Sequence, residues 1–112
     1  HHQFPDSAGD IAEEVRLYLE EHYGEKITLK RLCSWFGYSK TRLNQLFRES
    51  MGMSIYHCLM EIRMEKAKES LKKSEKSIYS IAQECGFSDQ NYFARQFKKH
   101  TGYTPGEYRR NS

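Results

Sequence analysis

The sequence predicts an all-helical fold in which two helix-turn-helix units share one long helix. Three observations lead to this prediction: apolar residues recur with a period near 3.6, no stretch alternates polar and apolar residues as a strand does, and one pattern of two helices around a turn occurs twice. The 112 residues are 38% hydrophobic and include only two prolines, which is enough for a modest core. We expect no β-sheet.

The net charge of +3 is unevenly distributed. Residues 1–25 hold one arginine and seven acidic residues, a net charge of −6, so the remainder carries +9. A basic body behind an acidic first helix suits a polyanionic partner such as nucleic acid, although a balanced solvated surface would explain the same charges. No apolar run approaches the ~20 residues needed to cross a bilayer, and no apolar signal-peptide segment lies near the start. We therefore expect a soluble, cytoplasmic protein.

The first helix is predicted to follow a tail of nine residues. Residues 1–9 read as a disordered tail, and His1 and His2 as the remnant of an expression tag. Asp10 and Glu13 have the spacing of a capping box, which predicts a helix beginning at Asp10, and Gly24 is expected to stop it. The expected apolar or mixed face of this helix consists of Ile11, Val15, Tyr18, Leu19 and His22.

The next two helices form a unit that the chain repeats. Thr28 is expected to cap a helix over residues 29–36, ended by Gly37. Residues 28–39 match residues 77–88 at an offset of 49, and after one inserted residue the match continues at an offset of 50. Each copy therefore predicts a short helix, a turn of glycine, aromatic residue and capping serine (Ser39 or Ser88), and a second helix of about twelve residues ended by glycine. This is a helix-turn-helix pattern, twice.

A long helix is predicted over residues 54–71, where neither glycine nor proline occurs. Its apolar residues fall on two stripes roughly 150° apart, which predicts that the helix serves one small core before it and another after it. A short closing helix is expected over residues 104–110, with a threonine cap, proline at the first position and glutamate at the third. The expected domains are residues 10–53, a linker helix 54–73, and residues 74–112. The first stripe contains Ile55, Leu59 and Ile62, and the second Met60, Met64, Ala67 and Leu71.

Signals for enzymatic or metal chemistry are missing. The chain has no nucleophile elbow, glycine-rich phosphate loop or zinc-protease motif, and its acidic residues are scattered among lysines as on a solvated face. Three cysteines without C-x-x-C spacing predict neither a zinc site nor a disulfide framework. We expect no enzyme and no cofactor, with Cys33, Cys58 and Cys85 as buried small residues. His22, His57 and His100 lack a partner at ligand spacing.

The second helix of each copy has a polar face on the side away from its core residues. With Leu43, Leu46 and Phe47 facing inward in copy one, and Phe93 and Phe97 in copy two, similar polar residue types face outward in both. Asn and Gln hydrogen-bond adenine bidentately and Arg does so with guanine, which favours base reading over an ordinary solvated face. The faces are Thr41, Asn44, Gln45 and Arg48, edged by Lys40 and Arg42, and Asn91, Ala94, Arg95 and Lys98, with Gln90 at the helix start.

The stretch I-A-Q-E-C-G-F-S-D-Q-N-Y-F-A-R-Q-F-K-K-H-T-G-Y-T-P-G-E-Y-R, residues 81–109, closely resembles the signature of the AraC/XylS family of bacterial transcription regulators, and the resemblance extends back to about Asp10. It implies a DNA-binding domain of seven helices, two helix-turn-helix subdomains joined by a linker helix. Gln45 departs from the pattern, since many members have arginine there. The base-contacting positions implied by the resemblance are Thr41, Asn44, Gln45, Gln90, Asn91 and Arg95.

From these residues we expect a sequence-specific domain for double-stranded DNA, with two recognition helices in successive major grooves. We expect RNA polymerase as a further partner, a monomeric fragment, and a full-length protein with an N-terminal sensing, dimerisation or receiver domain. The alternative is a helical protein-interaction module that docks on the transcription machinery. Base contacts are assigned to Lys40 together with the six positions above, and phosphate contacts to Ser39, Arg42, Arg48, Lys98 and Lys99.

Overall fold

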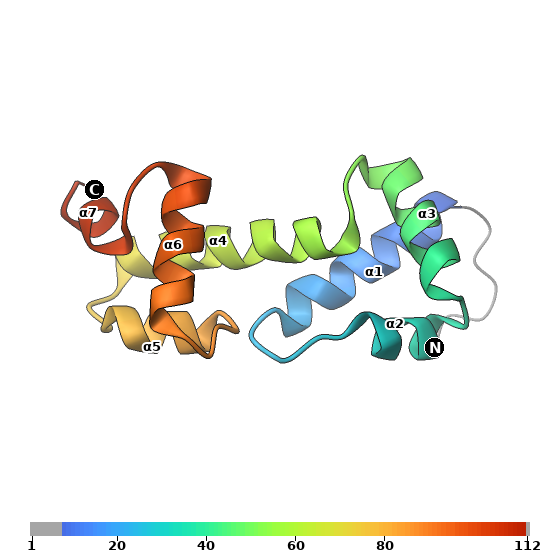
Figure 1. Cartoon of the computed structure of the whole chain (residues 1–112), viewed down its shortest axis with the longest axis horizontal. Helices are drawn as coiled ribbons and strands as arrows, with labels where there is room; N and C mark the ends of the chain where they lie inside the picture. The colour runs from blue at the N-terminus through green and yellow to red at the C-terminus, as the bar shows by residue number, and fades with distance from the viewer. Residues whose placement is uncertain (1–7, 112) are drawn as a thin grey trace. The chain divides into compact units, whose positions relative to one another are not determined.

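The computed structural model describes residues 8–111, which form seven helices and no strand (Figure 1). This confirms the predicted all-α class. None of the helices in residues 8–111 is long and apolar enough to cross a membrane. The helices are α1 (Ala8–His22), α2 (Leu29–Phe36), α3 (Lys40–Met51), α4 (Ile55–Lys73), α5 (Ile78–Glu84), α6 (Gln90–Thr101) and α7 (Pro105–Arg110).

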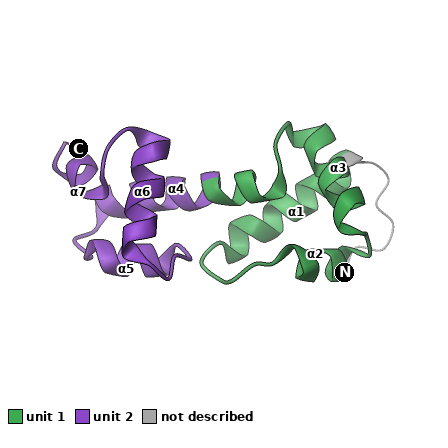
Figure 2. Cartoon of the chain, viewed as in Figure 1, with its two compact units in different colours: residues 1–60 green, residues 61–112 purple. Residues whose placement is uncertain are grey.

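The chain divides into two compact units, residues 1–60 and 61–112, and the division falls inside α4 (Figure 2). Unit 1 holds α1, α2, α3 and the first residues of α4, and unit 2 holds the rest of α4 with α5, α6 and α7. Each helix-turn-helix pattern of the sequence therefore lies within a single unit.

The core of unit 1 is mainly aliphatic, and α1 lies against α3. It forms because α1 and α3 each place apolar residues three and four positions apart, which gives each helix one buried side. The buried residues are Ile11, Ala12, Val15 and Leu19 of α1, Leu32 and Phe36 of α2, Leu43, Leu46 and Phe47 of α3, and Ile55, Cys58 and Leu59 of α4.

The predicted start of α1 was wrong, whereas the helix ends just before Gly24 as expected. The helix begins at Ala8, so Asp10 lies in its first turn and does not cap it; a carboxylate there still favours the positive end of the helix dipole. Ala8 and Gly9 are therefore helical, and the rest of the predicted tail lies outside the described residues. Gly24 follows the helix in a turn without a left-handed conformation, and His22 Nδ1 lies 2.8 Å from Glu25 Oε2.

The core of unit 2 contains a chain of aromatic rings. The ring centroids of Phe87 and Phe93 are 5.2 Å apart, those of Phe93 and Phe97 5.7 Å, and those of Phe97 and Tyr108 5.3 Å. Tilted and edge-to-face pairs at these distances are favourable beyond the area they bury. The rings join α6 to α7 and to the turn before α6, and the other buried residues of this unit are Ile62, Arg63, Met64, Ala67, Leu71, Ile81, Ala82, Cys85 and Pro105.

The closing helix α7 is tied to the end of α4. Thr104 and Glu107 form the predicted capping box, with Oγ1 of Thr104 accepting from the N–H of Glu107 and the carboxylate of Glu107 accepting from the N–H of Thr104. Arg109 donates from Nε to the carbonyl of Leu71 at 3.0 Å and from Nη2 to that of Ser74 at 3.2 Å. These are carbonyls at a helix end, which lack partners within the helix.

Both predicted stripes of the long helix are buried except at one position. Met60, the last residue of unit 1, is only half-buried. Ile62, which the helical pattern groups with the first stripe, falls on the unit 2 side of that division.

Two of the three cysteines are buried as predicted. Cys58 and Cys85 are buried, whereas Cys33 is half-buried, so the prediction for Cys33 was wrong. Its helix, α2, buries only Leu32 and Phe36, and residue 33 lies at the edge of that narrow face. Burial raises the pKa of the Cys85 thiol to about 11, with a further contribution from the charge of Glu84.

The division inside α4 predicts separate effects for two neighbouring buried residues. Leu59→Ala should lower the free energy of unfolding by about 2–5 kcal/mol, and the faster amide exchange should concentrate in residues 8–60. Met64→Ala is the matched variant, since Met64 is equally buried but belongs to unit 2. Its faster exchange should concentrate in residues 61–111. Identical exchange patterns for the two variants would show that α4 does not serve two cores.

Candidate nucleic-acid interface

The turn between α2 and α3 sets where α3 begins. Gly37 has φ 78°, a left-handed conformation that favours glycine, and its N–H donates to the carbonyl of Cys33 at 2.8 Å. Two residues later, Oγ of Ser39 accepts from the N–H of Arg42 at 3.2 Å and caps α3. Thr28 caps α2 in the same way, so the predicted caps of copy one are confirmed.

Copy two uses the same turn with a different cap. Gly86 has φ 91° at the place of Gly37, but the cap of α6 is Asp89 and the predicted capping role of Ser88 was wrong. Oδ1 of Asp89 accepts from the N–H groups of Asn91 at 2.8 Å and Tyr92 at 3.3 Å. The inserted residue therefore precedes the cap, and Asp89 aligns with Ser39 at the offset of 50 that holds along the rest of the helix.

Each second helix exposes the predicted polar face. On α3, Asn44 is half-buried and the other six predicted contact positions are exposed. On α6 the small Ala94 lies half-buried in the middle of an exposed polar face. The exposed residues are Ser39, Lys40, Thr41, Arg42, Gln45 and Arg48 in unit 1, and Gln90, Asn91, Arg95, Lys98 and Lys99 in unit 2.

Two side chains on these faces have neighbours that restrict them. Nη1 of Arg42 donates to Oε1 of Gln45 at 3.3 Å, which orients the Gln45 amide along the surface of α3. The guanidinium of Arg95 lies 5.8 Å from the centre of the Tyr92 ring, within the range of a cation–π interaction. Sequence reasoning missed Tyr92, although an aromatic residue three positions before an arginine on a helix is a usable signal.

The last turn of α6 concentrates positive charge. Lys98, Lys99 and His100 lie there, where cations are favoured at the negative end of the helix dipole. The hydrogen bond from the N–H of Thr104 holds the pKa of Glu107 below its usual value, and the positive charges of Lys98 and Arg110 contribute. The carboxylate of Glu107, held by the N–H of Thr104, therefore lies near the basic end of α6. Lys98 and Lys99 are exposed there, as a polyanion would require.

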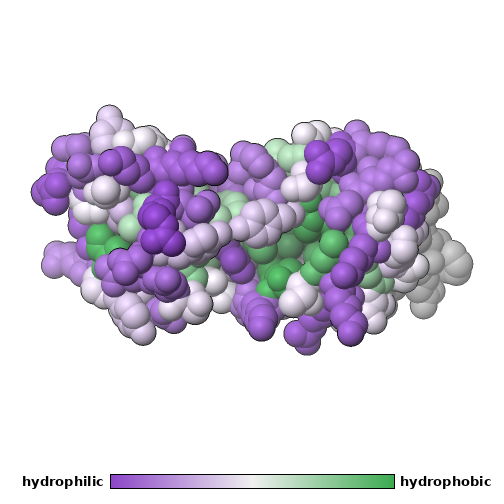
Figure 3. All heavy atoms as spheres, in the orientation of Figure 1, coloured by the Kyte–Doolittle hydropathy of each residue, from purple (hydrophilic) through white to green (hydrophobic). Residues whose placement is uncertain are grey.

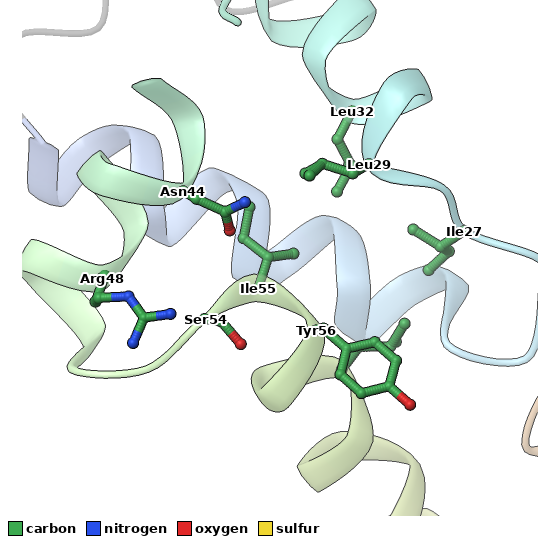
Figure 4. Close-up of a pocket in the computed structure, with 9 residues that line it drawn as sticks. Ile27, Leu29, Leu32, Asn44, Arg48, Ser54, Ile55 and Tyr56 are labelled. Carbon is green, nitrogen blue, oxygen red and sulfur yellow. The ribbon is translucent and has the colours of Figure 1, made fainter. Parts of the chain in front are cut away.

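A pocket of about 280 Å³ lies in unit 1 among α2, α3 and α4 (Figure 4). Figure 4 shows Asn44, Arg48 and Ser54 on one side of it and Ile27, Leu29 and Leu32 on the other. Figure 3 shows hydrophobic residues at the surface of unit 1, and a second hydrophobic group on unit 2, among mainly polar residues. No group of three or more His, Cys, Asp or Glu residues in the described part of the chain could hold a metal ion.

Comparison with known proteins assigns this architecture to a family. A family model described as a helix-turn-helix domain matches residues 32–111. The chain is 38% identical over 108 residues to the transcriptional activator RhaR of Yersinia pseudotuberculosis. The aligned region covers 96% of this chain and 37% of RhaR. The chain belongs to the AraC/XylS family. It is a helix-turn-helix DNA-binding domain of a transcription regulator.

Solved structures of AraC/XylS domains share the fold. The C-terminal domain of the response regulator AraT from Geobacillus stearothermophilus superposes with a TM-score of 0.88 at 35% identity, over 91% of this chain and 85% of that one. The DNA-binding domain of AdpA in complex with a target DNA gives a TM-score of 0.85 at 25% identity, over 89% of this chain and 90% of that one. The chain spans 37% of RhaR and 13% of a Staphylococcus aureus transcriptional regulator that is also 38% identical.

The capping of α6 predicts a contrast between two adjacent residues in this AraC/XylS domain. Asp89→Ala should lower the free energy of unfolding of unit 2 by about 0.5–2 kcal/mol, since it leaves two N–H groups at the start of α6 without their acceptor. Ser88→Ala should change it by less than about 0.5 kcal/mol. Urea titration of both variants measures the difference. A larger loss of unfolding free energy for Ser88→Ala than for Asp89→Ala would show that Ser88 is the cap of α6.

Proposed function

We propose that this domain binds double-stranded DNA sequence-specifically, with α3 and α6 as recognition helices in the major groove. The observation that carries the proposal is the recurrence of exposed Asn, Gln and Arg side chains on equivalent faces of both helices. Each face lies opposite a buried apolar face and directly after a capped turn, the arrangement in which a recognition helix presents its first turns to base edges. The likeness to AdpA, solved with a target DNA, supports it.

Base reading is assigned to residues whose side chains form directional hydrogen bonds. Asn44 and Gln45, like Gln90 and Asn91, suit adenine, and Arg95 suits guanine through a bidentate contact. Packing of its guanidinium on Tyr92 reduces the rotamer freedom that Arg95 would lose on binding. Lys40 and Thr41 complete the base-reading set, and Ser39, Arg42, Arg48, Lys98 and Lys99 are assigned to phosphates.

The two helices differ, so the proposed site has two unlike halves. The 19 residues of α4 give a helix about 28 Å long, close to the ~34 Å repeat of the duplex, and side-chain reach or DNA bending closes the difference. A single chain would then bind two half-sites about 10 base pairs apart in direct orientation. A symmetric dimer would instead require a palindrome.

The runner-up is a helical module that docks on a protein, and contact with RNA polymerase is compatible with either function. Because the chain spans only part of the RhaR and S. aureus regulators, we also propose that the whole protein carries a further sensing, dimerisation or receiver domain.

Selection of bound sites from random duplex DNA, followed by titration at several salt concentrations, tests the DNA-binding proposal. Phosphate contacts impose a steep salt dependence, and the absence of any selected motif would favour the protein-docking alternative.

Arg95 and Lys98 should affect DNA binding in different ways. Arg95→Ala should cost about 1–3 kcal/mol on the selected site and relax the preference at one base pair. Lys98→Ala should weaken binding to all sequences alike and reduce the salt slope by about one. Fluorescence anisotropy on the selected duplex and its single-base variants measures both. Identical profiles would remove the distinction between base and phosphate contacts.

Spacing between the half-sites should matter if one chain reads both. Inserting about 5 base pairs rotates one half-site by half a helical turn, so the affinity should fall towards that for one half-site alone. An insertion of about 10 base pairs is the control for added length without rotation. Undiminished affinity for the 5-base-pair insertion, titrated at fixed salt, would mean that α3 and α6 do not bind the duplex together.

A further inference from the structure

The pocket of unit 1 opens beside the proposed DNA-reading face. Its lining includes Asn44 and Arg48, both on α3 and both assigned above to DNA. The rest comes from the segment before α2, from α2 itself and from the start of α4, so the pocket lies wholly within unit 1. A molecule bound here would touch the recognition helix from the side.

On the polar side of the pocket, no described residue accepts a hydrogen bond from the positively charged Arg48 side chain. The side chains of Arg48 and Asn44 make no hydrogen bond or ion pair with the part of the chain that the structure describes. Ser54 contributes a hydroxyl, which already accepts from the N–H of His57 and can still donate. A guanidinium, an amide and a hydroxyl together offer several donors and one positive charge, the set that binds a carboxylate.

The opposite side of the pocket is mainly apolar. Ile27, Leu29 and Leu32 lie away from Arg48 in Figure 4, with the exposed Tyr56 below them, whereas Ile55 lies beside Asn44 and Ser54. A cavity of about 150 Å³ holds benzene, so about 280 Å³ holds roughly ten non-hydrogen atoms. Arg48 lies on the side of the lining away from Ile27, Leu29 and Leu32, which favours a ligand with one charged end and one hydrocarbon end.

We propose that this pocket binds a small amphipathic monocarboxylate, with its carboxylate on Arg48 and Asn44 and a hydrocarbon part of about seven carbon atoms against the apolar side. The bound ligand occupies two side chains of the DNA-reading face. It therefore competes with DNA for unit 1 and makes DNA affinity dependent on the concentration of the acid. This competition, though not the ligand site itself, rests on the proposed function.

Octanoate is the probe for direct binding, measured by isothermal titration and by amide shifts of the labelled domain. We expect saturable binding with a Kd of about 1 mM or tighter, as for a ligand of ten atoms with ordinary efficiency, and shifts confined to the pocket residues. Octan-1-ol, of the same length without charge, should bind at least about tenfold more weakly. No saturable octanoate binding, or equal affinity for the alcohol, would overturn the proposal.

Two variants and one control test the two sides of the pocket. Arg48→Ala should weaken octanoate binding about tenfold or more, whereas Arg42→Ala, which removes an exposed arginine of the same helix outside the pocket lining, should leave it unchanged. Ile27→Phe narrows the aliphatic end and should also weaken octanoate while leaving DNA affinity intact. Thermal unfolding of each variant checks the fold. Equal octanoate affinity in the Arg48 and Arg42 variants would contradict the assigned carboxylate contact.

Competition is measured separately from ligand binding. Octanoate should reduce affinity for the selected duplex to a saturating extent in the unmodified domain and not in Ile27→Phe, at constant ionic strength. If the domain binds octanoate but no duplex, the pocket stands and the proposed function fails. If it binds the duplex and octanoate has no effect on that affinity, the regulatory part of the inference is wrong.

Discussion

Burial of one side of each proposed recognition helix decides which residues its other side exposes. Leu43 and Phe47 of α3, and Phe93 and Phe97 of α6, are completely buried. Because positions three and four apart share a helical face, fixing these pairs inward fixes their polar neighbours outward. The Gly37 and Gly86 turns then set the position at which each helix starts. The surface proposed for DNA is thus a consequence of how the two small cores pack.

The two units form the same helix-turn-helix motif with different core side chains and different caps. Unit 1 packs mainly aliphatic side chains and caps α3 with a serine, whereas unit 2 stacks aromatic rings and caps α6 with an aspartate. In unit 2, Arg109 also closes the end of α4 through two carbonyls. Such differences allow two related recognition helices to present different residues while each unit keeps its own core. The proposed DNA site with two unlike halves rests on this divergence.

The difference between the two units also bears on the proposed effect of the pocket on DNA binding. It lies in unit 1 against the proposed recognition helix that carries Gln45, at the position where the family pattern has arginine in many members. A half-site bound through amide contacts is weaker than one bound through a bidentate arginine. A ligand that takes up Asn44 and Arg48 would therefore act on the half of the domain where a small change in free energy shifts occupancy most. Arg95, oriented by Tyr92 in unit 2, would remain available.

The sequence by itself determined the class, the repeat, the capping of α2, α3 and α7, and the outward polar faces. The caps depend on interactions within four residues, and the faces on the spacing of apolar residues along each helix, so both can be read from the order of residues in the chain. Helical period alone placed Leu59 and Leu71 correctly inside. The family resemblance supplied the candidate contact positions but could not show how their side chains are restrained.

Only the tertiary structure decided the features that depend on distant or competing partners. The start of α1 at Ala8 and the half-burial of Cys33 differ from what the local pattern predicted, and the residue inserted in copy two makes Asp89, rather than Ser88, the cap of α6. The bonds of Arg109 to carbonyls more than thirty residues away, and the pocket among α2, α3 and α4, have no local signal at all. They arise because packing brings together side chains whose spacing along the sequence has no period.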